Sequence, residues 1–337
     1  MTRVLAARCD SLGDVLLTGP ALRAIRAGSD HPTFLCGPRG VAAARLLPAV
    51  DALHVWHTPW IDAEPDPVDA AATRALVDWA AAQRFDHALI FTSFHQSPLP
   101  LALLLRLAGV PRISAISVDY PGSLLDLRHR VDDDLHEVER ACSLAAAAGY
   151  PRPAGDDGRL RVRPCPPHAA PDAPYVVVHP GASVPARAWA PEHHRALVER
   201  LTRAGRHVVV TGASDERALT AFVAGADADD LGGTLDLPQL AGVLEGADAV
   251  VVANTGPAHL AAAVGTPVVS LFAPTVPAAR WRPYGVAHRL LAIDVPCAGC
   301  RARACPVPGH PCLDALDPAA VAAAVDQLAP VRQEVAA

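Results

Sequence analysis

The stretch of the chain that most constrains its fold is residues 251–275, VVANTGPAHLAAAVGTPVVSLFAPT. Two apolar runs rich in β-branched residues, 250–252 and 268–272, flank a tight turn at 254–257 and a helix-forming segment at 258–264. Strand, turn, helix and strand therefore follow one another without an intervening long loop. This order is typical of a βαβ unit in an α/β protein.

The turn in this stretch suits an anion. Thr255 and Gly256 present backbone N–H groups at a helix start, and Pro257 is favoured as a first helical residue. The helix dipole adds positive potential, and His259 on the first turn is a further hydrogen-bond donor. The alternative is a well-capped helix between two buried strands, with no ligand.

The same α/β plan runs through both halves of the chain. We expect strands at 3–7, 33–36, 52–56 and 87–91, with helices between them and a further helix at 136–148. A proline-dense stretch, 151–174, then predicts a linker, and strands at 175–179 and 207–211 restart the pattern. The predicted fold is α/β with two doubly wound domains, 1–165 and 174–317, followed by a terminal helical segment at 318–337.

Composition excludes several classes of function. The net charge of -6 and the pI near 6.2 argue against a nucleic-acid-binding protein. The sequence has neither an apolar run of about 18 residues nor a signal peptide. We expect a cytoplasmic protein without a transmembrane segment, which meets any membrane-linked substrate at the membrane surface. All 29 basic residues are Arg, so Arg must fill positions where Lys is common.

A candidate catalytic carboxylate lies near the N-terminus, in Ser11-Leu12-Gly13-Asp14. In the functional interpretation, Gly13 lets a substrate approach and Asp14 acts as a base. In the structural one, Ser11 and Asp14 form a capping-box-like helix start. Arg8, His95 and the basic residues at 128–130 are candidates on the acceptor side. As a group, these residues favour an anionic acceptor.

The second half of the chain has a further candidate ligand-binding site, at the edge of the sheet that follows the strand at 175–179. Gly181 and Ser183 follow that strand, where ligands bind in open α/β folds. Arg187 carries a guanidinium fork suited to phosphate, whereas Trp189 is better explained as a core residue. The turn at 212–216 after the next strand is a weaker candidate, because an ordinary strand-to-helix turn explains it almost as well.

Four cysteines close to the C-terminus have the spacing C-x2-C-x4-C-x6-C. Four thiols at this spacing favour a structural zinc site, with disulfides or free thiols as alternatives and His310 as a substitute ligand. A closed site of four thiolates has no open coordination position, so we expect no catalytic role for the metal. The residues are Cys297, Cys300, Cys305 and Cys312.

Three segments together resemble glycosyltransferase family 9, the ADP-heptose:lipopolysaccharide heptosyltransferases. They are R...SLGDVLLTGPALRAIR at the N-terminus, HPGAS...RAW, and NTGPAHLAAAVGTPVVSLFAPT. Weaker matches, among them HEVERACSLAAAAG and WRPYG, occur in family order over nearly the whole chain.

The resemblance implies a GT-B architecture, in which two Rossmann-like domains face a central cleft. The first domain would bind the acceptor, the second the nucleotide sugar, and the terminal helix would pack back toward the first domain. The implied reaction is inverting, metal-independent glycosyl transfer from a nucleotide-diphosphate sugar, with ADP-heptose favoured, to a glycan, lipopolysaccharide-type or small-molecule acceptor. Asp14 matches the catalytic base, Arg187 a Lys that contacts donor phosphates, and the turn with Thr255, Gly256 and His259 the diphosphate site.

One position departs from the family pattern. Asn254 stands where the well-known heptosyltransferases carry an Asp that meets the sugar hydroxyls. The resemblance therefore does not fix the identity of the donor sugar. Two alternatives follow: a nucleotide-sugar-binding protein without transfer activity, and another GT-B enzyme such as a sugar-nucleotide epimerase. No cofactor is expected to be required for catalysis.

Overall fold

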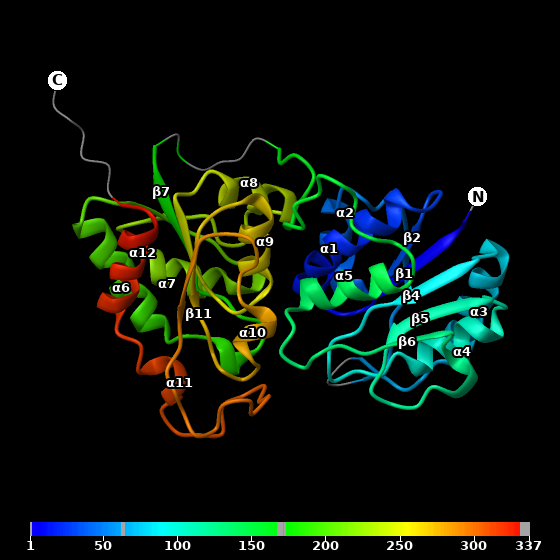
Figure 1. Ribbon diagram of the computed structural model, residues 1–337. Helices are drawn as coiled ribbons and strands as arrows, with labels where there is room; N and C mark the ends of the chain where they lie inside the picture. Colours follow the sequence, from blue (N-terminus) through cyan, green and yellow to red (C-terminus); the bar gives the residue numbers. More distant parts are fainter. Residues whose placement is uncertain (1, 62–64, 167–170, 172, 331–337) are drawn as a thin grey trace. The chain divides into compact units, whose positions relative to one another are not determined.

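The chain folds into two compact α/β units, each with its own parallel sheet (Figure 1). The computed structural model describes residues 2–61, 65–166, 171 and 173–330. The first unit spans Met1–Arg163 and the second Pro164–Ala337. The division falls within the proline-dense stretch that the sequence marks as a linker.

The first unit contains a six-stranded sheet in the order β3-β2-β1-β4-β5-β6, and all its pairings are parallel. Its strands are β1 (Val4–Arg8), β2 (Thr33–Cys36), β3 (Ala52–Val55), β4 (His87–Ile90), β5 (Arg112–Ile116) and β6 (Leu127–His129). Its α-helices are α1 (Leu12–Ala27), α2 (Val41–Leu46), α3 (Ala70–Gln83), α4 (Leu99–Leu107) and α5 (Glu137–Ala147), with short 3-10 helices η1 (Pro38–Gly40) and η2 (Gly122–Leu124).

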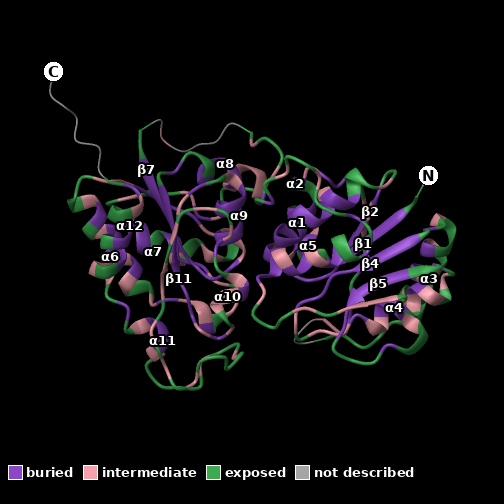
Figure 2. Cartoon of the chain, viewed as in Figure 1, coloured by how far each residue is buried: buried purple, intermediate pink, exposed green. Residues whose placement is uncertain are grey.

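Helices cover both faces of this sheet. Leu5 and Ala7 on β1 pack in a core with Leu76 of α3 and Leu105 of α4. Helices α1 and α5 pack against each other on the other side (Figure 1). Every residue of β1 and β4 is buried (Figure 2), as expected for central strands of a parallel sheet.

The second unit repeats this architecture with the order β12-β11-β10-β7-β8-β9, again parallel throughout. Its strands are β7 (Tyr175–His179), β8 (His207–Val210), β9 (Asp229–Asp230), β10 (Ala249–Ala253), β11 (Val268–Leu271) and β12 (His288–Leu291). Its helices are η3 (Pro185–Arg187), α6 (Pro191–Arg203), η4 (Ser214–Glu216), α7 (Arg217–Ala224), α8 (Leu237–Glu245), α9 (Gly256–Val264), α10 (Ala278–Trp281), α11 (Pro311–Asp314) and α12 (Pro318–Leu328).

The strand order reverses direction at one point in each sheet. In the first sheet the chain starts at β1 and returns beside it as β4, and in the second it starts at β7 and returns as β10. At such a switch point the connections leave toward opposite faces, so the carboxyl ends of the two central strands are left uncovered for a ligand. The loops after β1, β4, β7 and β10 are therefore the places to look for function.

The terminal helix α12 belongs to the core of the second unit. It packs on α6 and beside β11 and β12, and Val321 and Val325 are fully buried there. The apolar face of the helix is used within its own unit. That the segment at 318–337 also packs back toward the first domain stays a prediction. Within the described parts of the chain, no helix is both long and apolar enough to span a bilayer.

Candidate active site

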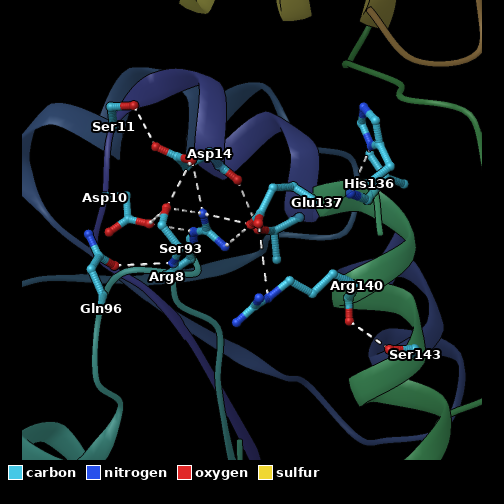
Figure 3. A network of polar contacts seen from close by, with 12 residues as sticks. Arg8, Asp10, Ser11, Asp14, Ser93, Gln96, His136, Glu137, Arg140 and Ser143 are labelled. Atoms are coloured by element: carbon cyan, nitrogen blue, oxygen red, sulfur yellow. Dashed lines mark hydrogen bonds and ion pairs between the residues drawn. The ribbon is translucent and has the colours of Figure 1, made fainter. Parts of the chain in front are cut away.

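The first switch point holds a buried network of charges centred on Arg8, the last residue of β1 (Figure 3). Its guanidinium lies 2.8 Å from Asp10 through Nε and 2.9 Å from Asp14 through Nη2. Glu137, on the first turn of α5, lies 3.4 Å from Nη1, and the Ser93 hydroxyl accepts from Nη2 at 3.0 Å. Four loops and helices thus converge on one cation.

The charged groups of this network shift one another's pKa values. Burial alone lowers the pKa of Arg8, but the charges of Asp10, Asp14 and Glu137 outweigh burial and hold this pKa above its ordinary value. Burial raises the pKa of Asp10 and of Glu137, and in both cases the charge of Arg8 opposes that rise. A buried cation without such partners would be strongly unfavourable, so the network is required for β1 to end in Arg8.

Asp14 is the carboxylate of this network that reaches the surface. Its side chain is 17% exposed, compared with 4% for Asp10 and 1% for Glu137. It lies on the first turn of α1, where the helix dipole favours a negative charge. Ser11, the N-cap of α1, makes no side-chain bond to the helix backbone; its hydroxyl donates to Asp14 Oδ2 at 2.7 Å. The capping-box alternative is therefore not the arrangement in the structure.

The acceptor-side candidates differ in how far they are buried. Gly13 is buried on the first turn of α1, beside Asp14. Arg8 is only 2% exposed, and its charge holds three carboxylates. Its place on the acceptor side stays a prediction. His95 is exposed on the loop after β4, with its ring edge-on to Phe94.

At the second switch point, Arg187 and the turn before α9 come together. Arg187 closes the short helix η3 after β7, and its Nη1 donates to the backbone carbonyl of Asn254 at 3.3 Å. This bond places a guanidinium beside the N-terminus of α9, although the two segments are 67 residues apart. A cation next to a helix N-terminus is a favourable environment for a phosphate.

The backbone donors of that turn are not all available. The Thr255 N–H donates to Ala253 O at 2.8 Å, so it is not directed at a ligand as the sequence suggests. The Gly256 N–H, at the first position of α9, has no backbone partner among the described residues. His259 is 5% exposed on the first turn of the same helix. Gly256 and the helix dipole therefore remain as the anion-binding features of the turn.

Asn254 is turned toward the protein backbone. Its Nδ2 donates to Ala273 O and its Oδ1 accepts from Ala273 N–H, both at 3.2 Å, and the residue is 5% exposed. The resemblance implies that the family residue at this position meets sugar hydroxyls; in the structure the amide of Asn254 ties the end of β10 to the end of β11.

Gly181 and Ser183 follow β7, and the glycine has a steric reason to be there. A Cβ on Gly181 would collide with the carboxylate of Glu216, which lies in η4 after β8. Glu216 also accepts from the Ala213 N–H at 2.8 Å. Ser183 is exposed at the same edge of the sheet. Trp189 is 2% exposed in the core, which confirms the structural interpretation of that residue.

The site also contains residues for which sequence reasoning assigned no role. Asp10 and Ser93 complete the network around Asp14, and Glu137 supplies its third carboxylate. Asp10 lies two residues after β1 and Ser93 three residues after β4, so topology alone brings them together. The signal available in advance was the position of each after a central strand, which becomes informative only once the strand order is known.

The four late cysteines are near enough to influence one another. Burial raises the pKa of Cys312, and Cys305, Cys297 and Cys300 raise it further. All eight cysteines are free thiols, so the disulfide alternative is not what the structure shows. Within the described residues, no group of three or more His, Cys, Asp or Glu side chains is arranged to hold a metal ion. Zinc at these cysteines stays a prediction.

Comparison with known proteins identifies the family of this chain. The family model described as glycosyltransferase family 9 (heptosyltransferase) matches residues 81–310. The lipopolysaccharide heptosyltransferase 1 of Pseudomonas aeruginosa is 30% identical over 332 residues, covering 90% of this chain and 87% of that protein.

Solved structures match over almost the full chain. The glycosyl transferase family 9 structure from Veillonella parvula has a TM-score of 0.78 at 17% identity and covers 97% of both chains. An Escherichia coli heptosyltransferase with ADP-2-deoxy-2-fluoro heptose has a TM-score of 0.70 at 23% identity, covering 97% of this chain and 99% of that one. The fold is the GT-B fold of glycosyltransferases. The chain belongs to glycosyltransferase family 9, the heptosyltransferase family.

Proposed function

We propose that this enzyme transfers a heptose from ADP-heptose to a hydroxyl of a lipopolysaccharide-type acceptor, with inversion at the anomeric carbon and without a metal ion in the chemical step. The names of the relatives support the donor and the acceptor: a lipopolysaccharide heptosyltransferase at 30% identity, and a solved heptosyltransferase with an ADP-heptose analogue. We further propose a cytoplasmic location, which suits eight free thiols.

The observation that carries the proposal is the position of Asp14. It is the surface-reaching carboxylate of a buried network, at the switch point of the first sheet. In an inverting transfer, a base takes the proton of the acceptor hydroxyl while its oxygen bonds to the anomeric carbon and the bond to the diphosphate breaks. Asp14 is the base in this proposal, since Arg8 and Ser11 fix its two oxygens.

The second unit would stabilise the leaving diphosphate. Negative charge builds on its oxygens as the glycosidic bond to the sugar breaks, and fixed donors lower the energy of that state. The guanidinium of Arg187, the Gly256 N–H and the N-terminus of α9 are such donors, and His259 lies on the same turn. Arg187 would supply the positive charge that a metal ion supplies in other enzymes.

The experiment is an assay of ADP release from ADP-heptose, with and without a heptose-free lipopolysaccharide core as acceptor. We expect acceptor-dependent turnover that falls by at least about 100-fold in Asp14→Asn, since general bases contribute about 10²–10⁴. Conversion of donor without acceptor would instead indicate an epimerase or hydrolase. Tight ADP binding with no turnover of ADP-, GDP- or UDP-sugars would indicate a binding protein.

A further inference from the structure

Ser93 lies between two carboxylates of the buried network (Figure 3). Its hydroxyl oxygen is 3.1 Å from Asp10 Oδ2 and 3.5 Å from Asp14 Oδ1, and it accepts from Arg8 Nη2 at 3.0 Å. A hydroxyl has one hydrogen and two lone pairs. With the hydrogen directed to the nearer Asp10 and one lone pair used by Arg8, one lone pair is left for a proton arriving on Asp14.

Asp10 is poorly compensated as an anion. Its Oδ2 pairs with Arg8 Nε at 2.8 Å, but among the described residues its buried Oδ1 has no hydrogen-bond partner. An anionic oxygen buried without a donor is costly, and protonation of the carboxyl removes that cost. Burial raises the pKa of Asp10, and the charge of Asp14 raises it further, which agrees with this geometry.

The charges that face Asp10 come from three elements. Arg8 lies on β1 and Asp14 on α1, while Glu137 and Arg140 lie on α5, with Glu137 Oε1 4.0 Å from Arg140 Nε. The neutral side chains of Gln96 and Ser93 oppose the rise in the pKa of Asp10, but the pKa stays above its ordinary value. Three carboxylates therefore face two guanidinium groups, and the addition of one proton makes the network neutral.

We propose that Asp14, Ser93 and Asp10 act as one proton-accepting unit, in which the Ser93 hydroxyl passes the proton of the acceptor from Asp14 to the buried Asp10. Asp14 takes the proton as the acceptor oxygen bonds to the sugar. It then gives this proton to Ser93 Oγ while the Ser93 hydroxyl proton moves to Asp10 Oδ2. Asp14 is ionised again and Asp10 is neutral, with no change in oxidation state. After product release, the proton returns by the same route and leaves through the exposed side of Asp14.

The unit resolves a difficulty in the proposed base role, on which this inference rests. A carboxylate held by a guanidinium is a weak base, because the ion pair favours its ionised form. Asp10 is paired with the same guanidinium, but burial raises its pKa, so it provides a second site for the proton of the acceptor. Asp10 and Ser93 are positioning residues in this scheme, because they act through Asp14.

The test is the pH dependence of kcat for Asp10→Asn, Ser93→Ala and Ser93→Thr. We expect Asp10→Asn and Ser93→Ala each to lower kcat about 10- to 100-fold, to move the acid limb of the profile to lower pH, and to leave KM for the donor within about twofold. The double variant should be little worse than either single variant, because the residues act as a unit. Ser93→Thr keeps the hydroxyl and should recover most of the activity.

Ser143→Ala is the matched control, since it removes a serine hydroxyl that bonds to Arg140 O within the same unit. Circular dichroism and ADP calorimetry check that each variant is folded, and Ser93→Ala alone decides if Asp10→Asn does not fold. Wild-type profiles for Asp10→Asn and Ser93→Ala, or a loss of kcat without a shift of the acid limb, would overturn the relay. If the relay is overturned but Asp14→Asn is inactive, the proposed function with Asp14 as the base still holds. If Asp14→Asn is active, the proposed role of Asp14 as the base is wrong, and the relay is wrong with it.

Discussion

Asn254 and Ala273 are joined by a pair of hydrogen bonds, one in each direction, between a side-chain amide and a backbone peptide group. The pairing uses one N–H and the oxygen of the amide. Aspartate could reproduce only the bond from Ala273 N–H, because an ionised carboxylate has no hydrogen to donate to Ala273 O. The departure of this chain from the family residue therefore has a structural explanation that does not involve the sugar.

The first prediction concerns this pair. Asn254→Asp should lower the free energy of unfolding by about 1–3 kcal/mol, because a buried carboxylate oxygen would face a carbonyl without a hydrogen bond. Urea denaturation of the two proteins measures the difference, and donor specificity should be unchanged. A variant as stable as the wild type, with altered choice among ADP-sugars, would restore Asn254 as a residue that selects the sugar.

Arg187 gives the second prediction. Arg187→Ala should weaken ADP binding about 10- to 100-fold in calorimetry, because hydrogen bonds to charged groups contribute about 1.5–3 kcal/mol. Arg187→Lys keeps the charge but not the planar fork, so an intermediate affinity is expected. Arg203→Ala, at a 73% exposed side chain on α6, is the matched control. Equal affinities for all four proteins would exclude Arg187 from the phosphate site.

Much of the fold could be predicted from the sequence, because its central strands are continuous apolar runs. β7 begins and ends where the pattern places it, and α12 begins where the terminal helical segment is expected. The sequence pattern does not predict β5, β6, β9 or β12. β5 is a mostly buried inner strand that the pattern misses. β9 has two residues, β6 has three, and β12 lies at the sheet edge with no buried position. Such short or edge strands form because a neighbouring strand offers hydrogen bonds, which local sequence does not record.

Only part of the candidate site could be predicted from the sequence, because the rest depends on contacts between distant segments. Asp14, Arg187 and the α9 turn carry family motifs, but Asp10 and Glu137 are 127 residues apart and meet only through the packing of α1 and α5. The burial of Arg8 was equally hidden, since Arg at a strand end is usually a surface residue.

Gly181 and Glu216 give the third prediction. Gly181→Ala should destabilise the protein by up to about 1 kcal/mol, because the new methyl group would displace the Glu216 carboxylate from its bond with Ala213 N–H. Glu216→Ala removes that carboxylate and the bond from Ala213 N–H, at a cost of about 1 kcal/mol. The double variant should therefore be close to Glu216→Ala alone. Strict additivity in thermal unfolding would show that the two residues do not interact.

The late cysteines give the fourth prediction. If the four thiols bind zinc, metal analysis of the purified protein should give close to one equivalent per chain, and Cys297→Ser with Cys300→Ser should abolish it. Transfer activity should be kept after chelation to the extent that the fold is kept, because the metal would be structural. Protein that is folded, active and free of metal would leave these residues as the free thiols seen in the structure.

The fifth prediction is a loss of stability in mild acid, to which His179 contributes. Burial lowers the pKa of His179 to about 4, and its Nδ1 lies 2.9 Å from Thr211 Oγ1. In the unfolded chain a histidine has a pKa of about 6.5, so the unfolded state takes up the proton first as the pH falls. The stabilising contribution of neutral His179 is therefore complete above about pH 6.5, decreases between pH 6.5 and about 4, and does not change further below that. Between pH 7.5 and 5 the loss of unfolding free energy should be about 2 kcal/mol for this residue.

The test uses His179→Gln, whose side chain does not titrate. Urea denaturation followed by tryptophan fluorescence should show a correspondingly smaller loss for this variant over this interval. An identical loss in the variant and the wild type would mean that His179 is already charged in the folded protein at pH 5.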